Sequence, residues 1–143
     1  IEPNAIHRLR GELPPPAAAE AASTDLLASV ERRKNGLPVL DLILLGLGED
    51  GHIASLFPGE AEALAANPAL FRPVVASKPP PLRLTMGYPL IAAADAVWVL
   101  ASGKGKEVAF AESLRDDGRT PCARLLRMRS VTTIFTDITL PVL

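Results

Sequence analysis

The chain has 143 residues, and 48% of them are hydrophobic, which is enough to bury the core of one domain and excludes a disordered segment. Its 15 Lys and Arg nearly balance its 16 Asp and Glu, so no excess charge favours a nucleic acid or an anionic membrane as partner. The single cysteine, Cys122, cannot form an internal disulfide bond, and neither a signal-peptide pattern nor a membrane-length apolar run is evident. These features favour the cytoplasm.

The first half of the chain predicts a helix followed by a buried strand. After Pro14–Pro16, a run of good helix formers predicts a helix over 17–33, which Gly36 and Pro38 end. A strand is expected over 39–47. Five of the six residues in 42–47 are apolar, a pattern typical of a strand that is covered on both faces.

The rest of the chain continues the alternation of helices and strands. The pattern predicts helices over 59–67, 89–94, 107–115 and 123–127, strands over 71–77, 96–101 and 130–136, and a stiff proline connector over 78–81. This order indicates a single α/β domain over 1–143, a doubly wound, mostly parallel sheet with helices on both faces. Three or four strands are few for an independent sheet, so we expect the domain to be incomplete.

The most informative segment is the loop that follows the strand at 39–47. Gly46, Gly48 and Gly51 allow sharp turns, and ligands of open α/β sheets bind at the carboxyl ends of strands. The imidazole of His52 can accept a proton near neutral pH, and Asp50 is placed to orient it. The glycine spacing also fits a dinucleotide loop, but that pattern alone is weak. The loop therefore predicts an active site.

A second glycine-rich loop, 102–106, lies between the strand at 96–101 and the helix at 107–115. The amino end of a helix carries free amide groups and a partial positive charge, which suit a phosphate group. Lys106 adds a positive charge at this point. The sequence thus places a basic side chain near the expected edge of the sheet.

Several blocks resemble the 6-phosphogluconolactonase family. The segment from Gly46 to Pro58 is similar to the signature of that family, 77–85 is similar to a second block, and the Gly103 to Lys106 spacing matches a third. Weaker similarity at 4–12 and 121–123 extends the resemblance over nearly the whole chain.

The resemblance implies a sugar-phosphate lactonase that hydrolyses 6-phospho-D-glucono-1,5-lactone in the oxidative pentose phosphate pathway, with no cofactor and no metal. His52 is expected to activate water and Asp50 to orient it. Arg83 and Lys106 are expected to bind the phosphate group, since a guanidinium can donate two parallel hydrogen bonds. The remaining substrate-binding candidates are Gly48, Glu49, Gly51 and Lys78, with the loop amides as donors to the oxyanion.

Two other functions stay open. Isoleucine at position 53 is similar to the related amino-sugar-phosphate deaminases. The acidic residue that is expected after it in a deaminase is missing from 55–58. A non-catalytic sugar-phosphate sensor is the third reading. Family members are longer and carry an amino-terminal phosphate loop, so the resemblance implies that the chain is a carboxy-terminal portion. We expect a monomer or weak homo-oligomer.

Overall fold

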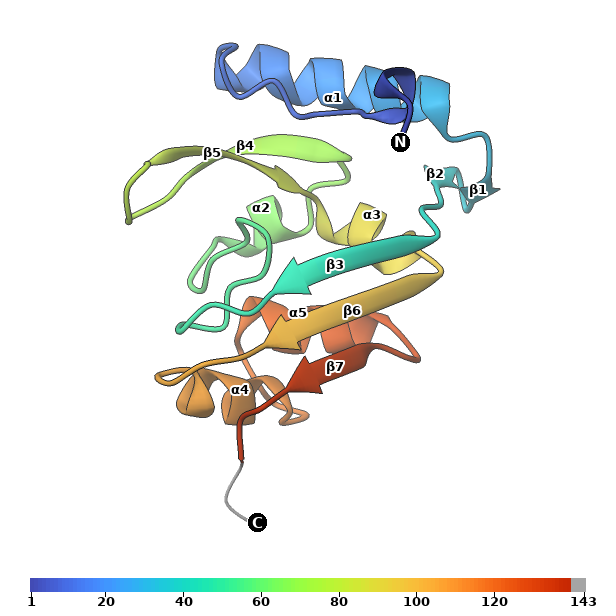
Figure 1. Cartoon of the computed structure of the whole chain (residues 1–143). Helices are drawn as coiled ribbons and strands as arrows, with labels where there is room; N and C mark the ends of the chain where they lie inside the picture. The colour runs from blue at the N-terminus through green and yellow to red at the C-terminus, as the bar shows by residue number, and fades with distance from the viewer. Residues whose placement is uncertain (140–143) are drawn as a thin grey trace.

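The computed structural model describes residues 1–139 (Figure 1). In chain order the elements are η1 (Pro3–Ala5), α1 (Pro15–Ser29), β1 (Arg33–Lys34), β2 (Leu37–Pro38), β3 (Leu42–Gly46), α2 (Glu62–Ala65), β4 (Phe71–Val75), β5 (Leu82–Met86), α3 (Tyr88–Ala93), β6 (Ala96–Ala101), α4 (Glu107–Ser113), α5 (Pro121–Met128) and β7 (Thr133–Thr136). Every helix and strand expected from the sequence is present, most of them shortened by a few residues. Strand β5 and the small β1–β2 pair were not predicted.

The largest sheet has the strand order β3, β6, β7, and both pairs are parallel. Leu44 pairs with Trp98, which in turn pairs with Thr133. All three arrows point the same way in Figure 1, so their carboxyl ends lie at one edge. The predicted α/β class with a parallel sheet is confirmed, and this edge is where the glycine-rich loops emerge.

The strand expected over 71–77 does not join this sheet, which corrects the expected topology. Instead β4 pairs with β5 in an antiparallel hairpin, and Val74 lies opposite Arg83. The proline segment 78–81 is the turn of this hairpin, so the chain reverses there and pairs locally. The hairpin lies between α1 and the rest of the molecule in Figure 1, and Phe71 packs with Ala19, Ala22 and Leu90.

Only one face of the β3–β6–β7 sheet is covered within residues 1–139, so the expectation of helices on both faces is wrong for this chain. The buried side chains of the covered face pack against residues of α3, α4 and α5. These buried sheet residues are Ile43, Leu45, Val97 and Val99. On the other face Leu44 is 58% exposed, and Leu100 and Phe135 are each 46% exposed. Helix α1 cannot cover this face because it packs on the β4–β5 hairpin.

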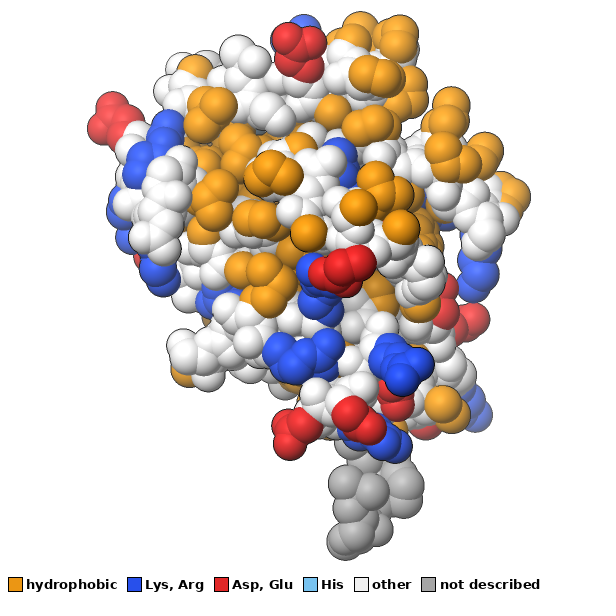
Figure 2. Space-filling view, turned by 180° about the vertical axis from the view of Figure 1, so that it is seen from behind, with side chains coloured by type: hydrophobic (Ala, Val, Ile, Leu, Met, Phe, Trp, Pro, Cys, Tyr) orange, Lys and Arg blue, Asp and Glu red, His pale blue; other side chains and the backbone are white. Residues whose placement is uncertain are grey.

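The opposite side of the molecule is partly charged. In Figure 2, which looks from behind, hydrophobic side chains gather in the upper part, while basic and acidic side chains lie next to one another below.

No helix in the described part of the chain has the length and apolar character needed to cross a bilayer.

Candidate active site

The loop after β3 is held by three buried apolar side chains. Leu47, Ile53 and Leu56 are at most 2% exposed, and isolated bridges join Ile53 to both of the others. The amide of Leu47 also donates to the carbonyl of Leu100 on β6, at 3.0 Å. The segment that carries Asp50 and His52 is therefore anchored at both ends, and polar side chains can be presented on a fixed backbone.

Asp50 and His52 are in direct contact, as the sequence predicted. Oδ1 of Asp50 lies 2.6 Å from Nδ1 of His52 and accepts the backbone amide of His52 at 3.2 Å. Burial acts to raise the pKa of Asp50, but the hydrogen bonds from the ring and backbone of His52 outweigh it and hold that pKa below its ordinary value. An ionised carboxylate at Nδ1 favours the tautomer that keeps its proton there, so Nε2 is left as the basic nitrogen.

The glycines of this loop serve close packing. A Cβ at Gly48 would overlap the ring of His52, so only glycine lets the imidazole lie against the backbone. Gly51 has a φ of +80°, and a Cβ there would come within 2.5 Å of the Thr120 side chain. Both conditions explain why this turn needs glycine at these two positions.

The amides of these glycines already donate hydrogen bonds within the turn. The amide of Gly48 donates to the carbonyl of His52 at 2.9 Å, and that of Gly51 donates to the carbonyl of Gly48 at 3.0 Å. They are not the free oxyanion donors that the sequence suggested. Both amides are used in hydrogen bonds that close the turn. An amide donor to the oxyanion must therefore come from another residue of the loop.

Arg83 lies close to the loop through the ring of Phe57. The guanidinium carbon of Arg83 is 5.3 Å from the centroid of Phe57, and the rings of Phe57 and His52 are 4.8 Å apart. Nε of Arg83 donates to the carbonyl of Pro80 at 3.0 Å, while Nη2 donates to those of Lys78 and Pro79 at 3.2 and 3.3 Å. Within residues 1–139 this leaves Nη1 for a ligand, so two parallel bonds through Nε and Nη2 are not available.

The exposed side chain of Lys78 makes no hydrogen bond or ion pair with the described residues, and its carbonyl accepts a hydrogen bond from Arg83.

The loop 102–106 lies beside the first loop. The carboxylate of Glu49 is 3.8 Å from the position that a Cβ of Gly105 would take. Lys106 is half-buried and precedes α4, and its charge helps to lower the pKa of Asp137, after the larger effects of hydrogen bonds from Ser102 and the amide of Gly103. The fold therefore brings the two loops together, although no direct contact joins Lys106 to Arg83 in the described part.

Sequence reasoning missed two side chains that position this loop. Phe57 contacts both His52 and Arg83, although in the sequence it reads as an apolar residue before Pro58. Thr85 on β5 accepts a hydrogen bond from the amide of Ser55 at 3.1 Å and is 2% exposed. Thr85 belongs to the block 77–85 that resembles the family, but its contact with Ser55 could not be predicted because it depends on the unpredicted hairpin.

A cavity of about 460 Å³ is lined by Phe57 and by charged side chains, among them Glu62 and Arg124. Arg124 donates to both carboxylate oxygens of Glu62, at 2.7 and 2.9 Å, and its guanidinium carbon is 5.0 Å from the centroid of the Tyr88 ring. Burial raises the pKa of Tyr88 to about 12, which keeps its phenol neutral. These contacts join α2, α3 and α5 into one wall behind the loop.

Metal-binding side chains are not gathered anywhere in residues 1–139: no group of three or more His, Cys, Asp or Glu residues could hold a metal ion. His7, the other histidine, pairs with Asp25 at 2.8 Å on the surface.

Cys122 is fully buried, and burial raises the pKa of its thiol to about 11. It is a structural residue rather than a nucleophile.

Comparison with protein families gives a match over nearly the whole chain. A family described as glucosamine-6-phosphate isomerases/6-phosphogluconolactonase matches residues 1–135. The 6-phosphogluconolactonase of Streptomyces coelicolor is 35% identical over 82% of this chain and 48% of its own length. The 6-phosphogluconolactonase of Homo sapiens is 34% identical over 85% of this chain and 46% of its own.

Solved structures agree. A crystal structure described as devB protein has a TM-score of 0.84 at 30% identity, covering 95% of this chain and 57% of its own. The 6-phosphogluconolactonase of Trypanosoma brucei has a TM-score of 0.73 at 31% identity, covering 95% and 55%. The chain thus spans about half the length of the relatives it matches. The expectation that this half is the carboxy-terminal one is not supported.

Proposed function

Since the chain belongs to the glucosamine-6-phosphate isomerase/6-phosphogluconolactonase family, we propose that it carries the catalytic loop of a lactonase that hydrolyses 6-phospho-D-glucono-1,5-lactone to 6-phosphogluconate. The observation that carries this proposal is the 2.6 Å contact between Oδ1 of Asp50 and Nδ1 of His52. A carboxylate at Nδ1 makes Nε2 a base and stabilises the imidazolium that forms when Nε2 takes a proton.

In the proposed reaction His52 acts first as a base and then as an acid. Nε2 takes a proton from water while the water oxygen bonds to the lactone carbonyl carbon, and the carbonyl π electrons move onto its oxygen. When the carbonyl re-forms, the bond from that carbon to the ring oxygen breaks. The imidazolium then returns its proton to the ring oxygen, and the new carboxyl group loses its proton to solvent. A general base of this kind contributes a rate factor of about 10²–10⁴.

The phosphate group of the substrate is proposed to lie between Arg83 and Lys106. Nη1 of Arg83 supplies charge-assisted donors, because its other nitrogens already bind carbonyls of the proline turn. Lys106 adds a point charge from the second loop. Glu49 of the first loop lies beside Gly105 of the second, and it is proposed to accept hydrogen bonds from substrate hydroxyl groups.

The test is lactone hydrolysis by this chain and by its His52→Ala variant, with His7→Ala as matched control. These are the only two histidines in the sequence, and His7 lies on the surface with Asp25. We expect His52→Ala to lower kcat by a factor of about 10²–10⁴ and His7→Ala to leave it unchanged. Equal rates for both variants would rule out His52 as the base.

The alternative within the same family is an amino-sugar-phosphate deaminase. A relative described as a monomeric glucosamine-6-phosphate deaminase shares the fold at 22% identity, which says nothing of activity. Ammonia release from glucosamine 6-phosphate distinguishes the two enzymes. Binding of either sugar phosphate without turnover of any substrate would favour the sensor instead.

The free thiol of Cys122 suits a reducing compartment, so we also propose the cytoplasm as the location of the protein.

A further inference from the structure

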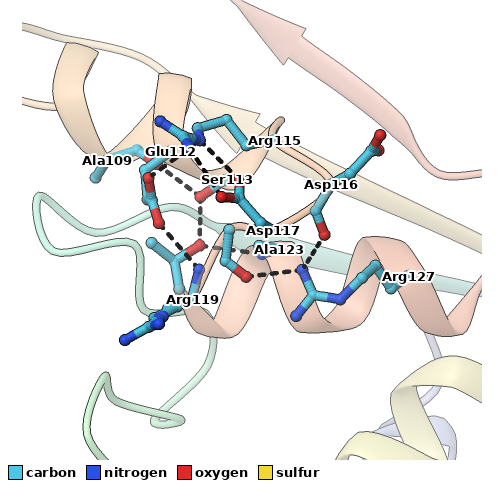
Figure 3. A network of polar contacts seen from close by, with 11 residues as sticks. Ala109, Glu112, Ser113, Arg115, Asp116, Asp117, Arg119, Ala123 and Arg127 are labelled. Atoms are coloured by element: carbon cyan, nitrogen blue, oxygen red, sulfur yellow. Dashed lines mark hydrogen bonds and ion pairs between the residues drawn. The ribbon is translucent and has the colours of Figure 1, made fainter.

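A buried pair of hydroxyl groups lies beneath the turn that carries His52. Thr120 precedes α5 and is 7% exposed, and Ser113, the last residue of α4, is 2% exposed. Their hydroxyl oxygens are 2.7 Å apart. Figure 3 shows this network, with Ser113 and Ala109 on one helix and Ala123 on the other.

The surrounding contacts determine which hydroxyl is the donor. The hydroxyl of Ser113 donates to the carbonyl of Ala109 at 2.6 Å, so its single proton is already used. Thr120 must therefore donate to Ser113. The same oxygen of Thr120 accepts the amide of Ala123 at 3.0 Å, which caps α5. One hydroxyl group thus links the end of α4 to the start of α5.

Thr120 also supports the catalytic turn directly. A Cβ at Gly51 would lie 2.5 Å from the Thr120 methyl carbon, so the two residues are in close packing contact. Two residues further on, the amide of Cys122 donates to the carbonyl of Gly51 at 3.2 Å. Gly51 stands between Asp50 and His52, so any shift of α5 moves both partners of the 2.6 Å contact.

The loop that precedes Thr120 is held from both helices, which makes this support rigid. The amide of Arg119 donates to the Glu112 carboxylate on α4 at 3.0 Å. The guanidinium of Arg127 on α5 donates to the carbonyl of Gly118 at 2.7 Å. Helix α4 begins immediately after Lys106. The network therefore also relates the helix that follows Lys106 to the turn that carries His52.

We propose that Thr120 is a positioning residue, whose hydroxyl group joins α4 to α5 and thereby holds the Gly51 turn, and His52 with it, in the geometry needed for catalysis. The kinetic part of this proposal rests on the proposed lactonase function. The structural part, the Asp50–His52 contact, can be measured without any substrate.

The experiment compares Thr120→Val with Thr120→Ser. Valine keeps the shape that packs on Gly51 but loses both hydrogen bonds of the hydroxyl, whereas serine keeps the hydroxyl. The first readout is the titration of the Asp50 carboxyl group by ¹³C NMR. Because hydrogen bonds from His52 lower the pKa of Asp50, we expect that pKa to rise toward its ordinary value in Thr120→Val and to stay low in Thr120→Ser. Glu12 of the amino-terminal segment, whose pKa is lowered by hydrogen bonds from Arg8, is the internal reference.

The second readout is lactone hydrolysis. We expect Thr120→Val to lower kcat roughly tenfold to a hundredfold with little change in KM, and Thr120→Ser to retain the original kcat. Ser113→Ala, which removes the acceptor of the Thr120 hydroxyl, should act in the same direction and replaces Thr120→Val if that variant fails to fold. If Asp50 titrates alike in the valine, serine and unsubstituted proteins, the proposal is wrong. If the unsubstituted chain hydrolyses no lactone, the proposed function fails, and the Asp50 titration alone decides the positioning role.

Discussion

The ring of His52 lies directly against the backbone of Gly48, in the space that a Cβ at that position would fill. The amide of Gly48 also donates to the carbonyl of His52 at 2.9 Å. The position of the imidazole is therefore set by the absence of a side chain four residues earlier. This relationship gives a sharp test of how closely the ring must be held.

Gly48→Ala should displace the His52 ring and lower kcat for lactone hydrolysis by about 10²-fold, since misplacement of a catalytic group by about 1 Å has this effect. Gly46→Ala is the matched control, because a Cβ at Gly46 meets no atom within 4 Å. Steady-state kinetics on the two variants provides the measurement. Equal activity of both would mean that the position of the ring against Gly48 does not matter.

Asp50 is expected to make stability depend on pH. Its folded-state pKa lies below the ordinary value, so its contribution is fully present above an unfolded-state pKa of about 3.9 and is lost as pH falls through the lower folded value. In Asp50→Asn this contribution is absent at every pH. Since the side chain is 36% exposed, we expect a loss of only about 1 kcal/mol at neutral pH.

Urea unfolding of both proteins between about pH 2 and 7 measures the difference. We expect the two unfolding free energies to converge as the pH falls. A constant difference across this range would show that Asp50 does not stabilise the folded chain through its charge.

Arg83→Ala should raise KM for the phosphorylated lactone by roughly tenfold to a hundredfold, because a hydrogen bond to a charged group contributes about 1.5–3 kcal/mol. Little change is expected for an unphosphorylated lactone. The same variant also frees the carbonyls of Lys78, Pro79 and Pro80, so its fold should be checked by circular dichroism. Equal losses on both substrates would contradict phosphate binding by Arg83.

The open face of the β3–β6–β7 sheet should make this chain associate. Leu44, Leu100 and Phe135 are each 46% exposed or more, and Trp98, the single tryptophan, lies on the same face against Phe135 with ring centroids 5.2 Å apart. We expect weak self-association with a shift of Trp98 emission to shorter wavelength as protein concentration rises.

Leu44→Lys should reduce this association, measured by sedimentation velocity. Val108→Lys is the control, since Val108 is 84% exposed on α4 and does not belong to the sheet face. A monomer with constant Trp98 emission at all concentrations would show that the face does not mediate contact between copies.

The sequence was sufficient for features that depend on neighbouring residues. The apolar run before Gly46 predicted β3, and strand 96–101 was predicted at its observed bounds. The spacing of Asp50 and His52 predicted their contact, because a tight turn can bring side chains two residues apart within hydrogen-bond distance. Family resemblance singled out the same loop from its order of residues alone.

The tertiary structure decided everything that depends on pairing between distant segments. Whether β4 joins the parallel sheet or pairs with β5 depends on competing partners that local propensity does not rank. The direction of Arg83, the hydrogen bonds of the glycine amides and the support by Thr120 follow from that packing. The open sheet face also follows from that packing. An apolar sequence indicates that a strand is suited to burial, but only the folded chain shows whether another surface covers it.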